Sequence, residues 1–118
     1  MSPKFAAMLR ALGMDVKALR EEFPQNILDI NLFRQLSGRD VALVGPDMKQ
    51  LTRQAEAREL KAAGISAVYF GAFWSKYELW PQAAWLVKNW PGIDSFMKIA
   101  ARGTVVEISQ KGRADLIR

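Results

Sequence analysis

The segment Val41-Ala42-Leu43-Val44-Gly45-Pro46-Asp47 decides the fold that we expect for this chain. Its first four residues are apolar and predict a short strand of the buried type, which Gly45-Pro46 terminates. Asp47 follows at once, and Met48–Arg53 is a basic start to a helix. Because ligands of open α/β sheets bind just beyond the carboxyl ends of strands, Asp47 stands where a carboxylate can hold a metal ion or accept a proton.

The composition limits the chemistry that the chain can carry out. Its 118 residues fit one domain, half apolar and a quarter charged, as in soluble globular proteins. With no cysteine and no histidine, thiolate nucleophiles, Ser-His-Asp triads and zinc sites built from these residues are excluded. Glycine-rich phosphate loops are also absent. Since no apolar run approaches the roughly 20 residues of a membrane span and no signal-peptide stretch is present, we expect a cytoplasmic protein without a membrane partner.

The net charge of +5 is open to two interpretations. It is compatible with a merely basic, soluble surface. It is also compatible with an anionic partner such as RNA, DNA or an acidic protein. The basic residues are spread along the chain without a run of five or more, so the charge alone does not choose between the two.

Hydrophobic periodicity and turn residues predict the order α-β-α-β-α-β-α-α-β. This alternation predicts an α/β fold with a mostly parallel sheet and helices on both faces. The predicted helices are a first one from Ser2-Pro3 to a stop at Gly13, then Ile27–Leu36, Gln50–Ala63, Lys76–Trp90, and a shorter one from the Pro91-Gly92 break to Ala101. The predicted strands are Met14–Leu19, Val41–Val44, Ser66–Gly71 and Thr104–Ile108, with a loop at Gly71–Ser75 and a short tail after the Lys111-Gly112 turn.

Asp29 and Asp47 are the two acids whose positions stand out. Asp29 lies at or just inside the start of the helix that leads to the strand before Asp47. A parallel βαβ unit places helix N-termini at the edge where strands end, so the two carboxylates can converge there. Carboxylates that hold Mg²⁺ or Mn²⁺ are a common means of phosphodiester hydrolysis. The alternatives are that Asp29 caps its helix and that Asp47 forms a turn or an N-cap.

Lys49 and Arg53 are the basic residues nearest to this proposed site. They lie one helical turn apart, just after Asp47, and are candidate contacts for a phosphate. The alternative for Arg53 is a surface ion pair with Glu56, three residues further on.

The four tryptophans lie between residues 74 and 90. Trp85 falls on the polar side of the predicted helix, where it is a candidate for a protein interface or, beside Lys88, for stacking on a nucleic-acid base. The alternative is burial against a loop or a neighbouring element. Trp80 lies at the edge of the face that we interpret as core, which consists of Leu79, Ala83, Leu86, Val87 and Trp90.

The ordered segments of the chain resemble the PIN-like domains of VapC-type toxins. It is the order of the segments over nearly the whole chain, rather than any single motif, that carries the resemblance. The segments are Ser2–Gly13, Leu19–Pro24, Asp29, Val41–Asp47, Ala62–Ile65, Trp85–Ile93 (Trp-Leu-Val-Lys-Asn-Trp-Pro-Gly-Ile) and Arg102–Ile108 (Arg-Gly-Thr-Val-Val-Glu-Ile).

The resemblance implies a three-layer α/β fold and an endoribonuclease in which Asp29 and Asp47, as catalytic metal ligands, bind Mg²⁺ or Mn²⁺. It also implies an RNA substrate, a cognate antitoxin protein that inhibits the toxin, and homodimerisation. The family's first strand, central in the sheet and carrying an aspartate, would precede Ser2, where Met1 stands. We therefore expect one PIN-like domain, residues 1–118, whose sheet is poorly closed or completed by another chain. The alternative is a non-catalytic PIN-like module that binds RNA or a protein.

Overall fold

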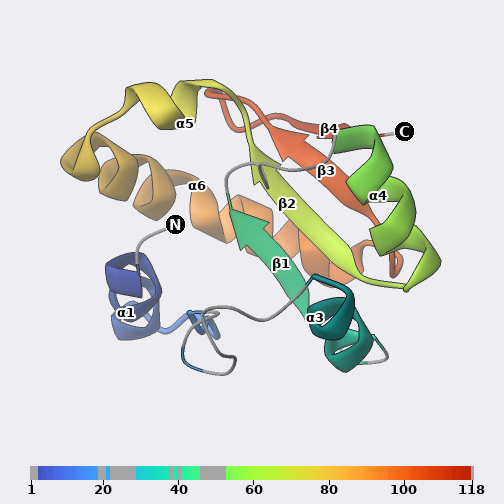
Figure 1. Ribbon diagram of the computed structural model, residues 1–118. Helices are drawn as coiled ribbons and strands as arrows, with labels where there is room; N and C mark the ends of the chain where they lie inside the picture. The colour runs from blue at the N-terminus through green and yellow to red at the C-terminus, as the bar shows by residue number, and fades with distance from the viewer. Residues whose placement is uncertain are drawn as a thin grey trace. The chain divides into compact units, whose positions relative to one another are not determined.

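The computed structural model describes residues 3–18, 21, 29–37, 39, 41–45 and 53–117, with the backbone alone for residues 29, 30, 33 and 53–56 (Figure 1). The chain divides into two units, Met1–Gln35 and Leu36–Arg118. The four-stranded sheet belongs to the second unit.

The first unit begins with helix α1, Pro3–Ala11, which confirms the predicted helix. Phe5, Ala6 and Leu9 are its buried residues, at the spacing of one helix face. Gly13 follows the helix at φ 91°, a left-handed conformation that glycine adopts without strain. The helix therefore stops where the sequence predicts.

The predicted strand Met14–Leu19 is wrong over the part that the structure describes, which has no regular secondary structure. Local hydrogen bonds occupy the backbone groups instead. The Met14 N–H donates to the oxygen of Leu9 at 3.0 Å. The oxygen of Val16 accepts a bond from the Arg10 guanidinium at 3.1 Å. Because these groups are satisfied by α1 and its own side chains, the segment needs no neighbouring strand.

Helix α3, Asp29–Leu36, confirms the second predicted helix over the described residues. Asp29 is the first residue of this helix that the structure describes. Leu32 and Leu36 are buried one turn apart, on the apolar side that the sequence indicates.

Over the described residues, the sheet contains four strands in the order β1 (Ala42–Gly45), β2 (Ser66–Phe70), β3 (Val105–Ile108) and β4 (Ala114–Leu116). The first three strands are parallel and β4 is antiparallel to β3, which confirms an α/β protein with a mostly parallel sheet. The β4 residues are part of the short tail that we expect from the sequence. The structure shows instead that the turn containing Gly112, at φ 83°, returns the chain along β3.

Each strand of this sheet is hydrogen-bonded to the next, from β1 to β4. The strands that the structure describes are therefore continuously paired, which contradicts a poorly closed sheet, whereas completion of the sheet by another chain stays a prediction. The register gives the reason: Ala42 pairs with Ser66 and Ala67 pairs with Val105, so β2 fills the position between β1 and β3.

The core lies on both sides of the two central strands. Successive residues of a strand point to opposite faces of the sheet. All four residues of Ala67–Phe70 are nevertheless at most 4% exposed, and the adjacent Val105 and Val106 of β3 are fully buried. Both faces of β2 and β3 are thus covered.

Two helices of the second unit pack against these strands. Helix α4, Arg53–Ala62, lies against β2 and β3 and buries Leu60. Helix α6, Leu79–Ile99, runs behind the sheet in Figure 1. The ring of its Trp85 lies 5.2 Å from the ring of Phe70, which places α6 on the face that carries Phe70.

Two predictions for residues 71–101 are wrong. The expected loop contains α5, Phe73–Lys76, a single helical turn whose Trp74 ring lies 4.5 Å from that of Phe70. The break expected at Pro91-Gly92 does not occur, because α6 continues through both residues. Pro91 cannot donate to the carbonyl of Val87, but both residues are on the exposed side of α6, where water can bind the free carbonyl.

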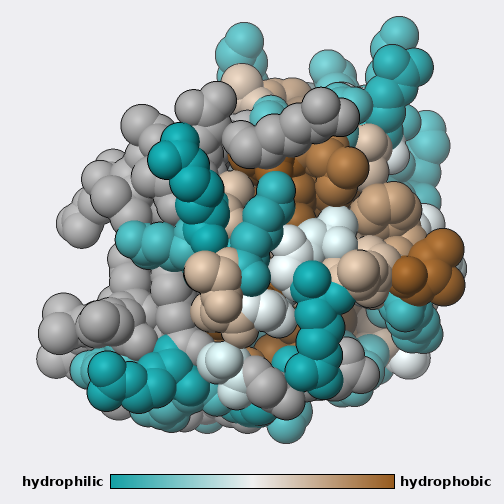
Figure 2. Space-filling model, turned by 90° about the vertical axis from the view of Figure 1, so that its right-hand side faces the viewer, coloured by the Kyte–Doolittle hydropathy of each residue, from teal (hydrophilic) through white to brown (hydrophobic). Residues whose placement is uncertain are grey.

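The described surface mixes polar and apolar groups. On the side shown in Figure 2, hydrophilic side chains surround smaller areas of hydrophobic surface. Among the described residues, no helix combines the length and the apolar character needed to cross a membrane. The large hydrophobic side chains that are exposed are Leu12, Val41, Leu79, Trp80, Val87, Phe96, Ile99 and Leu116.

Candidate functional site

The carboxyl ends of three parallel strands meet at one edge of the sheet. There β1, β2 and β3 end at Gly45, Phe70 and Ile108. The strand before Asp47 thus exists as predicted and ends two residues before this acid. Asp47 itself lies outside the described residues, and so does Lys49.

The register aligns four residues in a row across the sheet near this edge. Gly45 is level with Tyr69, Tyr69 with Glu107, and Glu107 with Asp115. Since neighbouring strands are about 4.8 Å apart, Glu107 lies roughly 10 Å from the end of β1. Glu107 is an acid that the sequence analysis did not single out. The available signal was its place as the single charged residue in an otherwise apolar, β-branched strand.

The carboxylate of Glu107 reaches the end of β2. This half-buried side chain places its Oε1 only 3.3 Å from the position that a Cβ on Gly71 would occupy. Gly71 directly follows β2, and its lack of a side chain leaves room for the carboxylate. The structure therefore puts an acidic group near the edge of the sheet where the described part of β1 ends, at Gly45.

The other two predicted site residues lie in helices, Asp29 in α3 and Arg53 in α4. Their side chains lie outside the described part of the structure, and with them the expected approach of Asp29 to Asp47 and the alternative ion pair between Arg53 and Glu56.

Carboxylate oxygens are the ligands that Mg²⁺ and Mn²⁺ prefer in proteins. Over the described side chains, no three histidine, cysteine, aspartate or glutamate residues form a group that could hold a metal ion. Glu107 and Asp115 pair across β3 and β4 and supply two carboxylates. The Glu107 carboxylate is thus a suitable ligand for such an ion, but the ion needs further oxygen ligands beside it.

The predicted exposure of Trp85 is wrong, and the alternative of burial is confirmed. Trp85 is only 6% exposed, and its ring lies 5.0 Å from that of Phe73. Its indole N–H donates to the backbone oxygen of Gln110 at 2.9 Å. The turn between β3 and β4 therefore covers the side of α6 that a helical projection shows as polar. A side chain so buried offers little surface to a protein partner or to a base.

Trp80, at the other side of α6, is the exposed tryptophan of the described chain. It is 84% exposed, and Lys88 on the same helix is exposed as predicted. Leu79 and Val87, which the sequence analysis assigns to the core face, are each 46% exposed. The core face of α6 is centred instead on Trp85, Leu86, Trp90 and Ile93.

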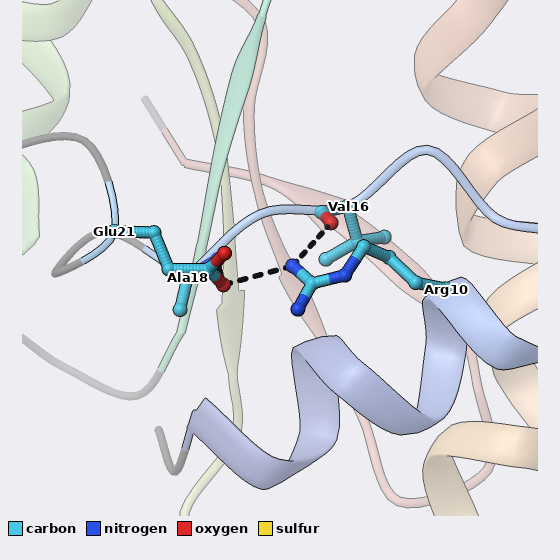
Figure 3. A network of polar contacts seen from close by, with 4 residues as sticks. All are labelled: Arg10, Val16, Ala18 and Glu21. Carbon is cyan, nitrogen blue, oxygen red and sulfur yellow. Dashed lines mark hydrogen bonds and ion pairs between the residues drawn. The ribbon is translucent and has the colours of Figure 1, made fainter.

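A polar network joins α1 to the segment that follows it (Figure 3). The Arg10 guanidinium donates to the Glu21 carboxylate at 2.8 Å and to the oxygen of Val16 at 3.1 Å. The same carboxylate accepts the backbone N–H of Ala18 at 3.0 Å. The bond from Arg10, followed by that from Ala18, lowers the pKa of the Glu21 carboxyl below its ordinary value. We assign this exposed network a structural role in the first unit.

Comparison of the chain with protein-family models, with curated proteins and with solved structures gave no significant match.

Proposed function

We propose that this chain is a PIN-like domain of the VapC type, a metal-dependent endoribonuclease. The order of its sequence segments supports this proposal. The observation that carries it is the parallel register that sets the end of β1, two residues before Asp47, in one row with Tyr69 and Glu107. A three-layer arrangement with helices on both faces of the sheet is part of the proposal, and burial of both faces of β2 supports it.

In the proposed site, Asp29 and Asp47 bind Mg²⁺ or Mn²⁺, and Glu107 adds a third carboxylate from β3. The ion, when bound, supplies an activated water and stabilises the charge that develops on the phosphate. Lys49 and Arg53 bind the phosphate on the RNA backbone and orient it. Lys88 attracts the RNA strand to the surface.

The proposal includes the partners that follow from the family resemblance. They are an RNA substrate, a cognate antitoxin protein that blocks the site, and a second copy of the chain in a homodimer. The proposed place of action is the cytoplasm, where the RNA substrate occurs. The net charge of +5 supports an anionic substrate.

RNA cleavage in the presence of Mn²⁺ tests the proposal, with the wild type compared with Asp47→Asn. We expect Asp47→Asn to lower the cleavage rate by about two orders of magnitude, because a metal-bound charge supplies several kcal/mol of transition-state stabilisation. Lys98→Ala is a matched control on the exposed side of α6. Equal cleavage by the wild type and Asp47→Asn would sink the catalytic assignment.

A non-catalytic PIN-like module that binds RNA or a protein partner is the second candidate. The basic, exposed Lys88 favours it as well as the nuclease, since binding requires no metal. Calorimetry with Mn²⁺ discriminates between the two. Clear binding that is lost in Asp29→Asn argues against the non-catalytic module, and absence of binding argues for it.

A further inference from the structure

The first half of α6 carries a surface that the proposed metal site does not use. Trp80, Ala84 and Lys88 follow at intervals of four residues and so form a stripe along one side of the helix. All three are exposed, and Trp80 is 84% exposed. At a rise of 1.5 Å per residue, the stripe extends over about 12 Å.

The turn between β3 and β4 is held firmly against α5 and α6. The Gln110 backbone oxygen accepts the indole N–H of Trp85 at 2.9 Å. The side-chain amide of Gln110 donates to the hydroxyl of Tyr77 at 2.8 Å. Within the turn, the Gly112 N–H donates to the oxygen of Ser109 at 2.8 Å. The position of this turn relative to the helices is therefore determined by hydrogen bonds on both sides.

A second exposed cation stands in the segment that contacts α6. Gly112 is so close to Asn89 that a Cβ on the glycine would lie 2.6 Å from the Asn89 Oδ1. Asn89 is the sequence neighbour of Lys88 in α6, and Lys111 is the sequence neighbour of Gly112 in the turn. The backbone segments that carry the two exposed lysines are therefore in contact, at the far end of the stripe from Trp80.

The charges of this surface are not neutralised within the described part of the chain. Lys88 and Lys111 form no ion pair there, whereas Lys98, further along α6, pairs with Asp94 at 2.9 Å. Glu78, at the start of α6, is an exposed acid on this part of the surface. Two cations without an ion pair, at the opposite end of the stripe from the exposed indole, thus remain available to an anionic partner.

We propose that the surface formed by Trp80, Ala84, Lys88 and Lys111 binds single-stranded RNA. One base stacks on the indole of Trp80, and the backbone phosphates contact Lys88 and Lys111. An aromatic platform beside cations is the usual means of binding single strands without sequence preference, because every base has a π-face. The choice of RNA rests on the proposed function. The surface itself involves none of the proposed metal ligands.

Binding of a fluorescein-labelled oligouridine, followed by fluorescence anisotropy in EDTA, tests this surface without metal or cleavage. We expect Trp80→Ala to raise the Kd roughly 5- to 100-fold, the range found for loss of one stacked base. Lys88→Ala and Lys111→Ala should each lower the slope of log affinity against log salt by about 0.7. Ile99→Ala and Lys98→Ala are the matched controls: an exposed apolar residue and a paired cation of the same helix, both without effect.

Intrinsic fluorescence gives a second measurement, which should show no quenching by RNA if Trp80 had only a structural role. Trp74, Trp85 and Trp90 are at most 6% exposed, so RNA that stacks on the surface should quench the solvent-exposed emission of Trp80 alone. This quenching should be absent in Trp80→Ala. Quenching that persists in this variant contradicts the proposed stacking.

Unchanged affinity of Trp80→Ala and Lys111→Ala overturns the proposed surface. Trp80-dependent binding to phosphatidylserine vesicles without any binding of oligouridine overturns it in favour of a lipid surface. Failure of the nuclease proposal gives a different result: oligouridine binds in EDTA with the expected Trp80 dependence, but Mn²⁺ produces no cleavage. The reverse result, Asp47-dependent cleavage with Trp80-independent binding, retains the nuclease and rejects the surface.

Discussion

The indole N–H of Trp85 donates to the backbone oxygen of Gln110 at 2.9 Å and thereby fastens the β3–β4 turn to α6. Trp90, on the same helix, is equally buried, yet its Nε1 has no hydrogen-bond partner in the described part of the chain. The two tryptophans therefore form a matched pair for measuring how much the Trp85–Gln110 hydrogen bond contributes to the free energy of unfolding.

Replacing each of these tryptophans with phenylalanine should affect stability differently. Both changes remove similar buried volume, but Trp85→Phe also removes a hydrogen bond, whereas Trp90→Phe removes an unpaired donor. We expect Trp85→Phe to lower the free energy of unfolding by about 1 kcal/mol more than Trp90→Phe. Urea denaturation of the two variants measures the difference. A larger loss for Trp90→Phe contradicts the hydrogen-bond assignment.

Substitution of three glycines by alanine should separate backbone strain from steric clash. Gly112→Ala should be the most destabilising, since φ is 83° and the new Cβ would lie 2.6 Å from the Asn89 Oδ1. Gly13→Ala meets only the strain of φ 91° in open space. Gly92→Ala, within α6 and without a close neighbour, should stabilise by about 0.5–1 kcal/mol. Thermal unfolding orders the three, and an equal loss in all of them contradicts the expected order.

The Arg10–Glu21 pair should make the first unit sensitive to acid. The pKa of the Glu21 carboxyl is lowered in the folded chain, chiefly by the bond from Arg10. Its contribution to stability is therefore present above the ordinary glutamate pKa and is lost as the pH falls through the lowered pKa. The protection of the α1 amides against hydrogen exchange, relative to an unfolded chain at the same pH, should fall over this acidic range. Glu21→Gln and Arg10→Met should both remove this pH dependence, and its persistence in either variant is the contrary result.

Glu107 should contribute to metal binding if the proposed site is formed at the sheet edge. We expect Glu107→Gln to weaken the binding of Mn²⁺ about 10- to 100-fold, the usual effect of losing a group in or next to the coordination shell. Calorimetry measures the affinity. Asp115→Asn is the control, because this acid lies opposite Glu107 on β4, one strand further from the end of β1. An equal effect of the two changes would place the ion elsewhere.

The parallel strands were predictable from the sequence. Each one lies between turn residues and a segment with the hydrophobic periodicity of a helix, so the local sequence pattern was sufficient to place it. Strand β4 was not predictable in this way: Ala-Asp-Leu has no apolar run, and it becomes a strand only by pairing with β3. Continuation of α6 through Pro91 likewise depends on the exposure of that side of the helix. Burial of Trp85 could not be predicted either. Its neighbours on the helix surface are polar, and it is buried only because the β3–β4 turn covers it.

In the candidate site, too, some features follow from local sequence pattern and others depend on pairing between distant residues. The strand before Asp47 and the helix that contains Asp29 follow from local rules. Glu107 becomes part of the site only through the register of β2 with β3, which pairs residues distant in sequence. Periodicity within one segment contains no information about such pairing.

The register of β2 with β3 also has a consequence for the order of folding. It joins residue 67 to residue 105 across the whole of α6, whereas the β3–β4 hairpin joins residue 106 to residue 116. Closing the longer loop costs more chain entropy, so the hairpin and α6 should form first. The step that brings Tyr69 beside Glu107 then comes late, and a folding intermediate halted before it would contain a complete hairpin but no candidate site.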